Sequence, residues 1–236
     1  LLYITTILIW GSSWLAIKFQ LGYVDPMVSV AYRFILASGI SWLYCIYSGK
    51  LMCFGLRDHF LMFLQGTCLF SLNYLLFYIS ELTLTSGLAA VIFSTLVVMN
   101  MVNGIIFLKN RLELRMGFGA CIGIAGIVMV FWPEITNFEI GDENLTATAI
   151  AVLATFLASL GNIVSARNQK NGVPVIQANT YGMAYGALLM LALSFASGKE
   201  FTIELTASYI GSLLFLSVFA TIFAFFSYLT LVGRVG

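Results

Sequence analysis

Polar and aromatic side chains recur on one face of the first long apolar segment of the sequence. Trp10 is followed three, four and eight positions later by Ser13, Trp14 and Lys18, a spacing that places side chains on one face of an α-helix. Indole, hydroxyl and ammonium groups on such a face suit the binding of a small organic solute. Polar packing between helices uses the same residue types, so a cavity lining and a contact between helices both remain open.

Amide and phenol groups extend this pattern into other apolar segments. Asn73 and Tyr78 lie in one of them, and Asn100 and Asn162 lie in two others. An amide surrounded by hydrocarbon needs a hydrogen-bonding partner, which water or solute in a cavity supplies. We therefore predict that the following residues bind a substrate: Trp10, Ser13, Trp14, Asn73, Tyr78, Asn100 and Asn162.

Three charged residues lie in or beside the apolar segments, and we assign Lys18, Arg33 and Glu81 to a gate or a charge pair. Charges inside a membrane are costly and usually face a cavity or a partner. Lys18 is close to a helix end, so its alternative is to extend toward the membrane interface. For Arg33 the alternative is a buried structural role, in which it pairs with Glu81 or with carbonyl groups at a helix end.

The residue types needed for catalysis or metal binding are not grouped anywhere in the sequence. The four cysteines form no Cys-x-x-Cys pair, and the single histidine, His59, follows Asp58 in a charged loop. Paired intramembrane carboxylates and a glycine loop for phosphate are also missing. The sequence therefore predicts a protein that is not an enzyme, with no catalytic residue, no metal and no cofactor.

The amino-acid composition is far more apolar than that of a water-soluble protein. Of the 236 residues, 61% are apolar and 9% are charged, whereas soluble domains carry about 25% charged residues. The net charge of +1 provides no general attraction to nucleic acid. We therefore expect a membrane protein whose partners are the lipid bilayer and a small-molecule substrate, and not nucleic acid. The sequence does not indicate an oligomeric state.

Long apolar runs recur along the whole chain. A transmembrane helix needs about 20 mostly apolar residues. Runs of this kind cover residues 1–21, 27–47, 60–80, 88–108, 116–132, 145–166, 176–196 and 209–231. The sequence therefore predicts an all-α polytopic membrane protein, with these runs as its spans.

The charges of the connecting loops differ between the two sides of the membrane. Lys199 is the basic residue of the loops on one side, where acidic residues such as Asp142 and Glu143 accumulate. The loops on the other side, together with the C-terminal end, contain Lys50, Arg57, Lys109, Arg111, Arg115, Arg167, Lys170 and Arg234. Short loops rich in Lys and Arg stay in the cytoplasm. We expect a multi-pass protein of the cell membrane with a cytoplasmic N-terminus.

A weak internal repeat relates the two parts of the chain. A shift of 149 positions aligns Ser13 with Asn162 and Lys18 with Arg167. A unit of five helices crosses the membrane an odd number of times, so a second copy has the opposite orientation. Inverted repeats of this kind are typical of secondary transporters.

This repeat predicts the domain organisation. Residues 1–132 form the first five-helix repeat, residues 133–144 an external linker, and residues 145–236 the first three helices of the inverted second repeat. The fold expected is therefore two inverted five-helix repeats with the second one truncated, so that eight of ten helices are present. A parent protein with two further helices after Gly236 is expected.

Four stretches of the sequence carry a resemblance to a known family. They are Trp10-Gly11-Ser12-Ser13-Trp14, Pro26 with Ala31-Tyr32-Arg33-Phe34, Thr85-Ser86-Gly87-Leu88-Ala89-Ala90, and the glycine-rich stretch from Gly117 to Gly126. In this order and spacing they resemble the drug/metabolite transporter superfamily, specifically its EamA-type ten-helix metabolite exporters.

The resemblance and the polar stripe together imply a transporter. We expect it to export small neutral or zwitterionic metabolites, such as amino acids, by alternating access. One alternative is a multidrug or sugar/nucleotide-sugar carrier of the same superfamily. Another is a non-transporting membrane sensor or scaffold, because a fold alone does not establish a function.

Overall fold

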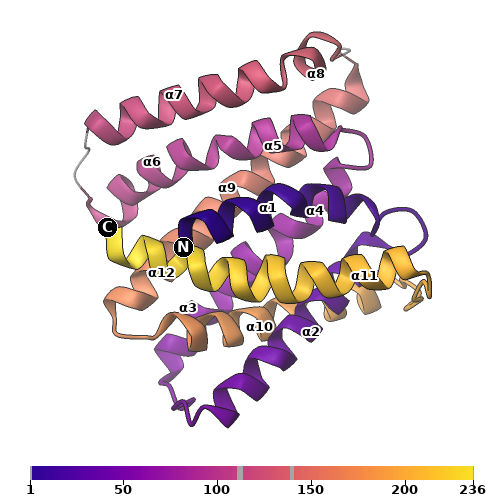
Figure 1. Ribbon diagram of the computed structural model, residues 1–236. Helices are drawn as coiled ribbons and strands as arrows, with labels where there is room; N and C mark the ends of the chain where they lie inside the picture. Colours follow the sequence, from indigo (N-terminus) through magenta and orange to yellow (C-terminus); the bar gives the residue numbers. More distant parts are fainter. Residues whose placement is uncertain (1, 111–113, 139–140, 236) are drawn as a thin grey trace.

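The chain is built of helices throughout the part that the structure describes (Figure 1). The structure is a computed structural model, and it describes residues 2–110, 114–138 and 141–235. The elements are α1 (Leu2–Lys18), α2 (Pro26–Tyr47), α3 (Leu56–Thr67), η1 (Cys68–Leu72), α4 (Asn73–Ser80), α5 (Ser86–Ser94), α6 (Leu96–Leu108), α7 (Leu114–Val130), α8 (Trp132–Thr136), α9 (Asp142–Lys170), α10 (Val175–Ala196), α11 (Ala207–Phe215), η2 (Leu216–Phe223) and α12 (Ala224–Val235).

Most of these helices are long and apolar enough to cross a membrane. In the described part of the chain, five continuous helices meet that requirement by length and composition: Pro26–Tyr47, Leu56–Ser80, Ser86–Leu108, Asp142–Lys170 and Ala207–Leu231. Two shorter apolar helices are α1 and α7. The remaining long helix, α10, spans 22 residues and carries polar Gln177, Asn179 and Thr180 in its first half. The prediction of an all-α polytopic membrane protein is confirmed.

Two helix starts show how local sequence sets these boundaries. Asp25 precedes α2, and its carboxylate accepts a hydrogen bond from the backbone N–H of Met27 at 2.9 Å. Pro26 occupies the first helical position, where its missing N–H costs nothing. Thr85 caps α5 in the same way, with its hydroxyl oxygen 3.2 Å from the backbone nitrogen of Leu88.

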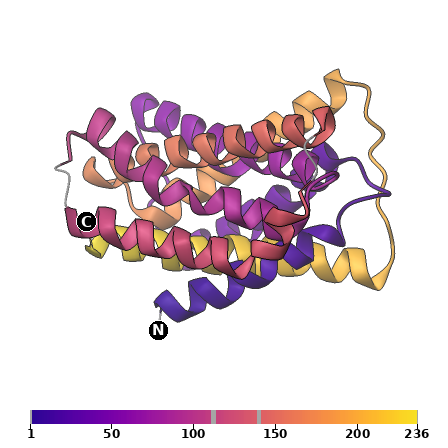
Figure 2. The same ribbon diagram turned by 90° about the horizontal axis from the view of Figure 1, so that it is seen from above.

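The interior lies where the long helices cross. α2 packs against α10, and α9 contacts α3, α4 and α6. Figure 1 shows α7 at one edge of the bundle and α2 at the opposite edge, and Figure 2 shows from above that α1 and α7 are inclined to each other. Close approach depends on glycine, because a Cβ on Gly66 would overlap the carbonyl group of Gly182 and one on Gly186 would lie 2.7 Å from the carbonyl oxygen of Phe70.

Equivalent elements of the two expected repeats have matching ends. α2 and α10 are both 22 residues long and start 149 positions apart. Both are followed by Ser-Gly-Lys, in which Gly49 has φ 60° and Gly198 has φ 62°. The backbone N–H of Lys50 bonds to Cys45 and that of Lys199 to Ser194, each at 2.9 Å, which is the glycine-terminated helix end of a Schellman motif. Our sequence analysis missed this repeated tripeptide.

A second correspondence involves the two π-helical segments. Moved by 149 positions, η1 falls at residues 217–221, inside η2. Single π-turns within α-helices are rare and often lie at functional sites. These correspondences support the inverted repeat, which stays a prediction together with its boundaries.

Candidate functional site

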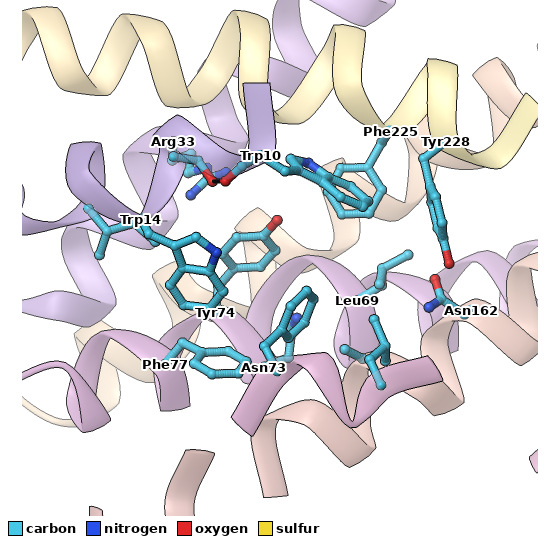
Figure 3. A pocket seen from close by; sticks show the side chains of 15 residues that line it. Trp10, Trp14, Arg33, Leu69, Asn73, Tyr74, Phe77, Asn162, Phe225 and Tyr228 are labelled. Carbon is cyan, nitrogen blue, oxygen red and sulfur yellow. Dashed lines mark hydrogen bonds between the residues drawn. The ribbon is translucent and has the colours of Figure 1, made fainter. Parts of the chain in front are cut away.

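A small cavity lies between helices of both expected repeats. Its volume is about 60 Å³. Side chains from α1, α2, η1, α4, α5, α6, α9 and α12 line it (Figure 3). The lining consists of Trp10, Ser13, Trp14, Ile17, Arg33, Leu69, Asn73, Tyr74, Phe77, Phe93, Leu96, Ala158, Asn162, Phe225 and Tyr228.

Aromatic rings form most of the walls. Trp14 meets Phe77 and Phe93 edge to face, with ring centroids 5.3 and 5.5 Å apart. Trp10 meets Phe225 in the same geometry at 5.1 Å. Edge-to-face pairs hold rings in defined orientations. The walls therefore offer a fixed apolar surface to the body of a solute.

One buried cation faces this cavity. Arg33 is 1% exposed, and its Nε donates a hydrogen bond to the hydroxyl oxygen of Thr221 at 3.1 Å. Its Cζ lies 4.4 Å from the centroid of the Tyr74 ring, a cation–π contact. The hydroxyl of Thr221 in turn donates to the carbonyl oxygen of Leu216 at 2.8 Å, across the π-turn of η2. Among the described residues, Nη1 of Arg33 has no hydrogen-bonding partner.

Two amides of the lining have buried acceptor oxygens that are also unpaired within the described structure. They are Oδ1 of Asn73 and Oδ1 of Asn162. The Nδ2 group of Asn162 donates to Oδ1 of Asn100 at 3.4 Å. Figure 3 shows the hydroxyl of Tyr228 pointing toward the amide of Asn162, while Arg33 is drawn on the opposite side of the cavity. The cavity thus has a guanidinium group at one end and an amide at the other.

Most of the predicted binding residues come together here. Trp10, Ser13, Trp14, Asn73 and Asn162 line the cavity. Two of their polar groups already bond to the backbone. The indole N–H of Trp10 donates to the carbonyl of Ala220 at 3.1 Å, and the hydroxyl of Ser13 donates to the carbonyl of Trp10 at 2.8 Å.

Two predicted binding residues lie behind the cavity surface. Asn100 is not a lining residue, and side-chain hydrogen bonds join it to two residues that are, Asn162 and Tyr228. Tyr78 is fully buried in the core beside the cavity and is not one of the lining residues.

The three charged residues of the predicted gate do not form a single group. Arg33 lines the cavity, whereas Lys18 and Glu81 do not. The expected Arg33–Glu81 pair is not formed, since Glu81 accepts a hydrogen bond from the hydroxyl of Ser86 at 3.1 Å and Arg33 bonds to Thr221.

Glu81 lies just beyond the span that ends at Ser80, and it is 2% exposed. Burial raises the pKa of its carboxyl group to about 7, while the hydrogen bond from Ser86 and the charge of Lys18 lower the pKa. This carboxyl group therefore exchanges a proton near neutral pH.

Sequence reasoning missed several wall residues. Phe93, Phe225 and Tyr228 line the cavity but are aromatic residues in apolar helices, which packing or a lipid-facing position explains equally well. Thr221 also escaped notice, because its role depends on a π-turn that the helical period of 3.6 does not reveal.

Comparisons with known proteins agree with this architecture. The model of the EamA-like transporter family matches residues 1–132. An uncharacterized transporter of Archaeoglobus fulgidus is 24% identical over 221 residues, which cover 93% of this chain and 75% of that protein. Protein PagO of Salmonella typhimurium is 24% identical over 236 residues, covering 98% of this chain and 75% of that protein.

A solved crystal structure has the same fold. It superimposes with a TM-score of 0.77 at 16% sequence identity, over 97% of this chain and 76% of the other chain.

Proposed function

The chain belongs to the EamA-like transporter family, and from this membership we propose that it exports small neutral or zwitterionic metabolites, such as amino acids, across the cell membrane. The proposed mechanism is alternating access, with the N-terminus in the cytoplasm. The observation that carries the proposal is the cavity, whose lining includes Arg33, Asn73 and Asn162, each with a buried polar atom that has no hydrogen-bonding partner in the described structure.

The position of the cavity supports a transport site. Its lining combines helices from residues 1–132 with α9 and α12 from the second expected repeat. In transporters built from inverted repeats, the substrate site lies between the repeats near the middle of the membrane. Rocking of one repeat against the other then opens this site to either side in turn.

The small volume of the cavity fits a closed state of such a cycle. One water molecule needs at least about 10–15 Å³ of cavity volume, so a cavity of about 60 Å³ holds a few waters. A whole amino acid enters only when the helices separate. We place Lys18 and Glu81 at the external gate, because both lie toward the end of the bundle that the loop charges assign to the outside.

The charge of the described lining bears on the alternative solutes. It contains Arg33 and no carboxylate, which disfavours cationic drugs. A nucleotide sugar carries phosphate groups that need several cations, and Arg33 is the cation of this lining. A non-transporting sensor or scaffold would bind a ligand without moving it.

Counterflow in proteoliposomes tests the proposal. Vesicles loaded with one unlabelled amino acid are assayed for uptake of the same labelled amino acid, across a panel that includes L-phenylalanine. We expect saturable exchange that falls at least tenfold in Trp14→Ala. Trp42→Ala serves as the matched control, because Trp42 packs against Tyr181 outside the cavity. Specific binding without exchange, or equal rates in both variants, would contradict the proposal.

A further inference from the structure

We propose that Arg33 binds the carboxylate group of the transported solute, so that the substrates are organic acids, amino acids among them, with an apolar or aromatic body. This inference rests on the proposed transport function and names the chemical group that the site recognises. It assigns Arg33 to the binding site and not to the gate, where the sequence analysis placed it.

The guanidinium group is held in place by a hydroxyl group and by aromatic side chains, the phenol of Tyr78 among them, and its Nη1 lacks a partner in the described structure. Thr221 accepts its Nε–H at 3.1 Å, and the rings of Tyr74 and Phe34 lie 4.4 and 5.6 Å from Cζ. The π-turn of η2 fixes the hydroxyl of Thr221 through its bond to Leu216. These contacts set the orientation of Arg33, which lines the cavity, while its Nη1 is buried and has no hydrogen-bonding partner among the described residues.

The charge of this guanidinium group is also unbalanced within the described structure. The ion pair found there joins Lys199 to Asp25, with nitrogen and oxygen 2.8 Å apart. Glu81 is bound to Ser86 instead. A buried arginine without a negative partner is strongly unfavourable, and a carboxylate matches the planar fork of its N–H donors with two parallel hydrogen bonds. A solute carboxylate would supply both the missing charge and the missing acceptor.

The rest of the cavity defines what accompanies the carboxylate. Rings of Trp14, Phe77 and Phe93 pack edge to face and form an apolar wall of the same cavity. The unpaired acceptor oxygens of Asn73 and Asn162 suit N–H donors such as an ammonium group. A carboxylate is therefore required for binding, the aromatic wall favours an apolar body, and an amino group is accommodated.

Matched ligand pairs test this assignment on the purified protein. The carboxylates 3-phenylpropionate and L-phenylalanine are compared with the uncharged or monocationic amides 3-phenylpropionamide and L-phenylalaninamide by isothermal titration calorimetry. We expect each carboxylate to bind the unsubstituted protein at least tenfold more tightly than its amide. Arg33→Gln should abolish this preference, and Arg33→Lys should keep part of it because the charge remains.

A second arginine provides the control. Arg57→Gln removes the same side chain at an exposed position and should leave the preference intact. The comparison of carboxylate with amide uses the unsubstituted protein, so it can still contradict the proposal if Arg33→Gln does not fold.

The possible outcomes separate this inference from the transport function. Equal affinity for carboxylate and amide, no binding of either carboxylate, or an unchanged preference in folded Arg33→Gln would overturn the role of Arg33. Carboxylates that bind with the expected preference but do not exchange in counterflow would overturn transport and leave the role of Arg33 standing.

Discussion

Two buried polar regions of this molecule use similar side chains for different purposes. In the amide cluster formed by Gln65, Asn168 and Asn179, the side chains bond directly to one another: Gln65 Nε2 donates to Asn179 Oδ1 and Asn168 Nδ2 donates to Gln65 Oε1, both at 2.8 Å. Arg33 and Asn162 line the cavity instead, and Nη1 of Arg33 and Oδ1 of Asn162 are buried there without a hydrogen-bonding partner in the described structure.

The surroundings of the two regions explain this difference. The amide cluster joins α3, α9 and α10, where Gly66 and Gly182 bring backbones into contact and leave no room for solute. Around the cavity, large rings keep the helices apart. Polar residues in a membrane bundle therefore act as packing contacts where glycine permits close approach, and as a binding surface where aromatic side chains prevent it.

Gly66→Val should have the largest effect, because its side chain would overlap the carbonyl group of Gly182. Overpacking of this kind usually costs about 1–3 kcal/mol, and here the obstacle is backbone, so we expect loss of folded protein. Folded yield after size-exclusion chromatography measures it. Gly11→Val is the control, since a Cβ at Gly11 meets nothing within 4 Å. Equal yields would show that the contact at Gly66 is not tight.

The carboxyl group of Glu81 should make stability depend on pH. Its pKa is raised from 4.5 to about 7 in the folded protein, so the folded state holds the proton more tightly than the unfolded state. The stability it contributes is complete below about pH 4.5 and is lost as the pH rises through 7, by at most about 3 kcal/mol. Thermal unfolding from pH 5 to 8 should show this loss, and Glu81→Gln should reduce it. The same pH dependence of stability in the unsubstituted protein and in Glu81→Gln would refute the raised pKa of Glu81.

Gln65→Ala tests the amide cluster. Removing Gln65 leaves Asn168 and Asn179 without these bonds in a buried site, which costs about 1–3 kcal/mol. Thermal unfolding should detect this loss, while the affinity for L-phenylalanine should stay within twofold of the original. A large fall in affinity with unchanged stability would reverse the roles that we give to the two regions.

Asn162→Ala should have the smallest effect on stability, below about 1 kcal/mol, because the bond from its Nδ2 to Asn100 is long, at 3.4 Å, and its Oδ1 has no partner to lose in the described structure. Its effect should appear in binding, with the affinity for L-phenylalanine reduced about tenfold. Titration calorimetry beside thermal unfolding measures both quantities. A variant that is destabilised but binds normally would place Asn162 among the packing residues.

The sequence predicted the long helices more completely than it predicted the residues that line the cavity. Apolar length alone located the long helices, since the bilayer imposes that length. The stripe of Trp10, Ser13 and Trp14 was found because polar groups are conspicuous on an apolar helix. The same signal placed Asn100 on the cavity surface, although its amide lies one hydrogen bond behind it.

The parts that escaped prediction depend on relations between distant helices. What a buried amide does is decided by its neighbours. Asn162 and Asn168 lie on the same helix, and each donates through Nδ2 while its Oδ1 has no partner in the described structure, but Asn168 belongs to the amide cluster and Asn162 lines the cavity. The orientation of Arg33 depends on Thr221, 188 positions away in the chain. Contacts of this kind between distant residues produce no periodic pattern in a single sequence, so they could not be predicted from it.

Labelling of a cavity residue from each side of the membrane tests the central claim most directly. Ser13→Cys, in a protein whose native cysteines are replaced by serine, is exposed to a membrane-impermeant maleimide added inside or outside the vesicles. Alternating access predicts labelling from both sides, slowed by L-phenylalanine in each case. Labelling from one side alone, or rates that L-phenylalanine does not change, would contradict a solute site that opens to each side in turn.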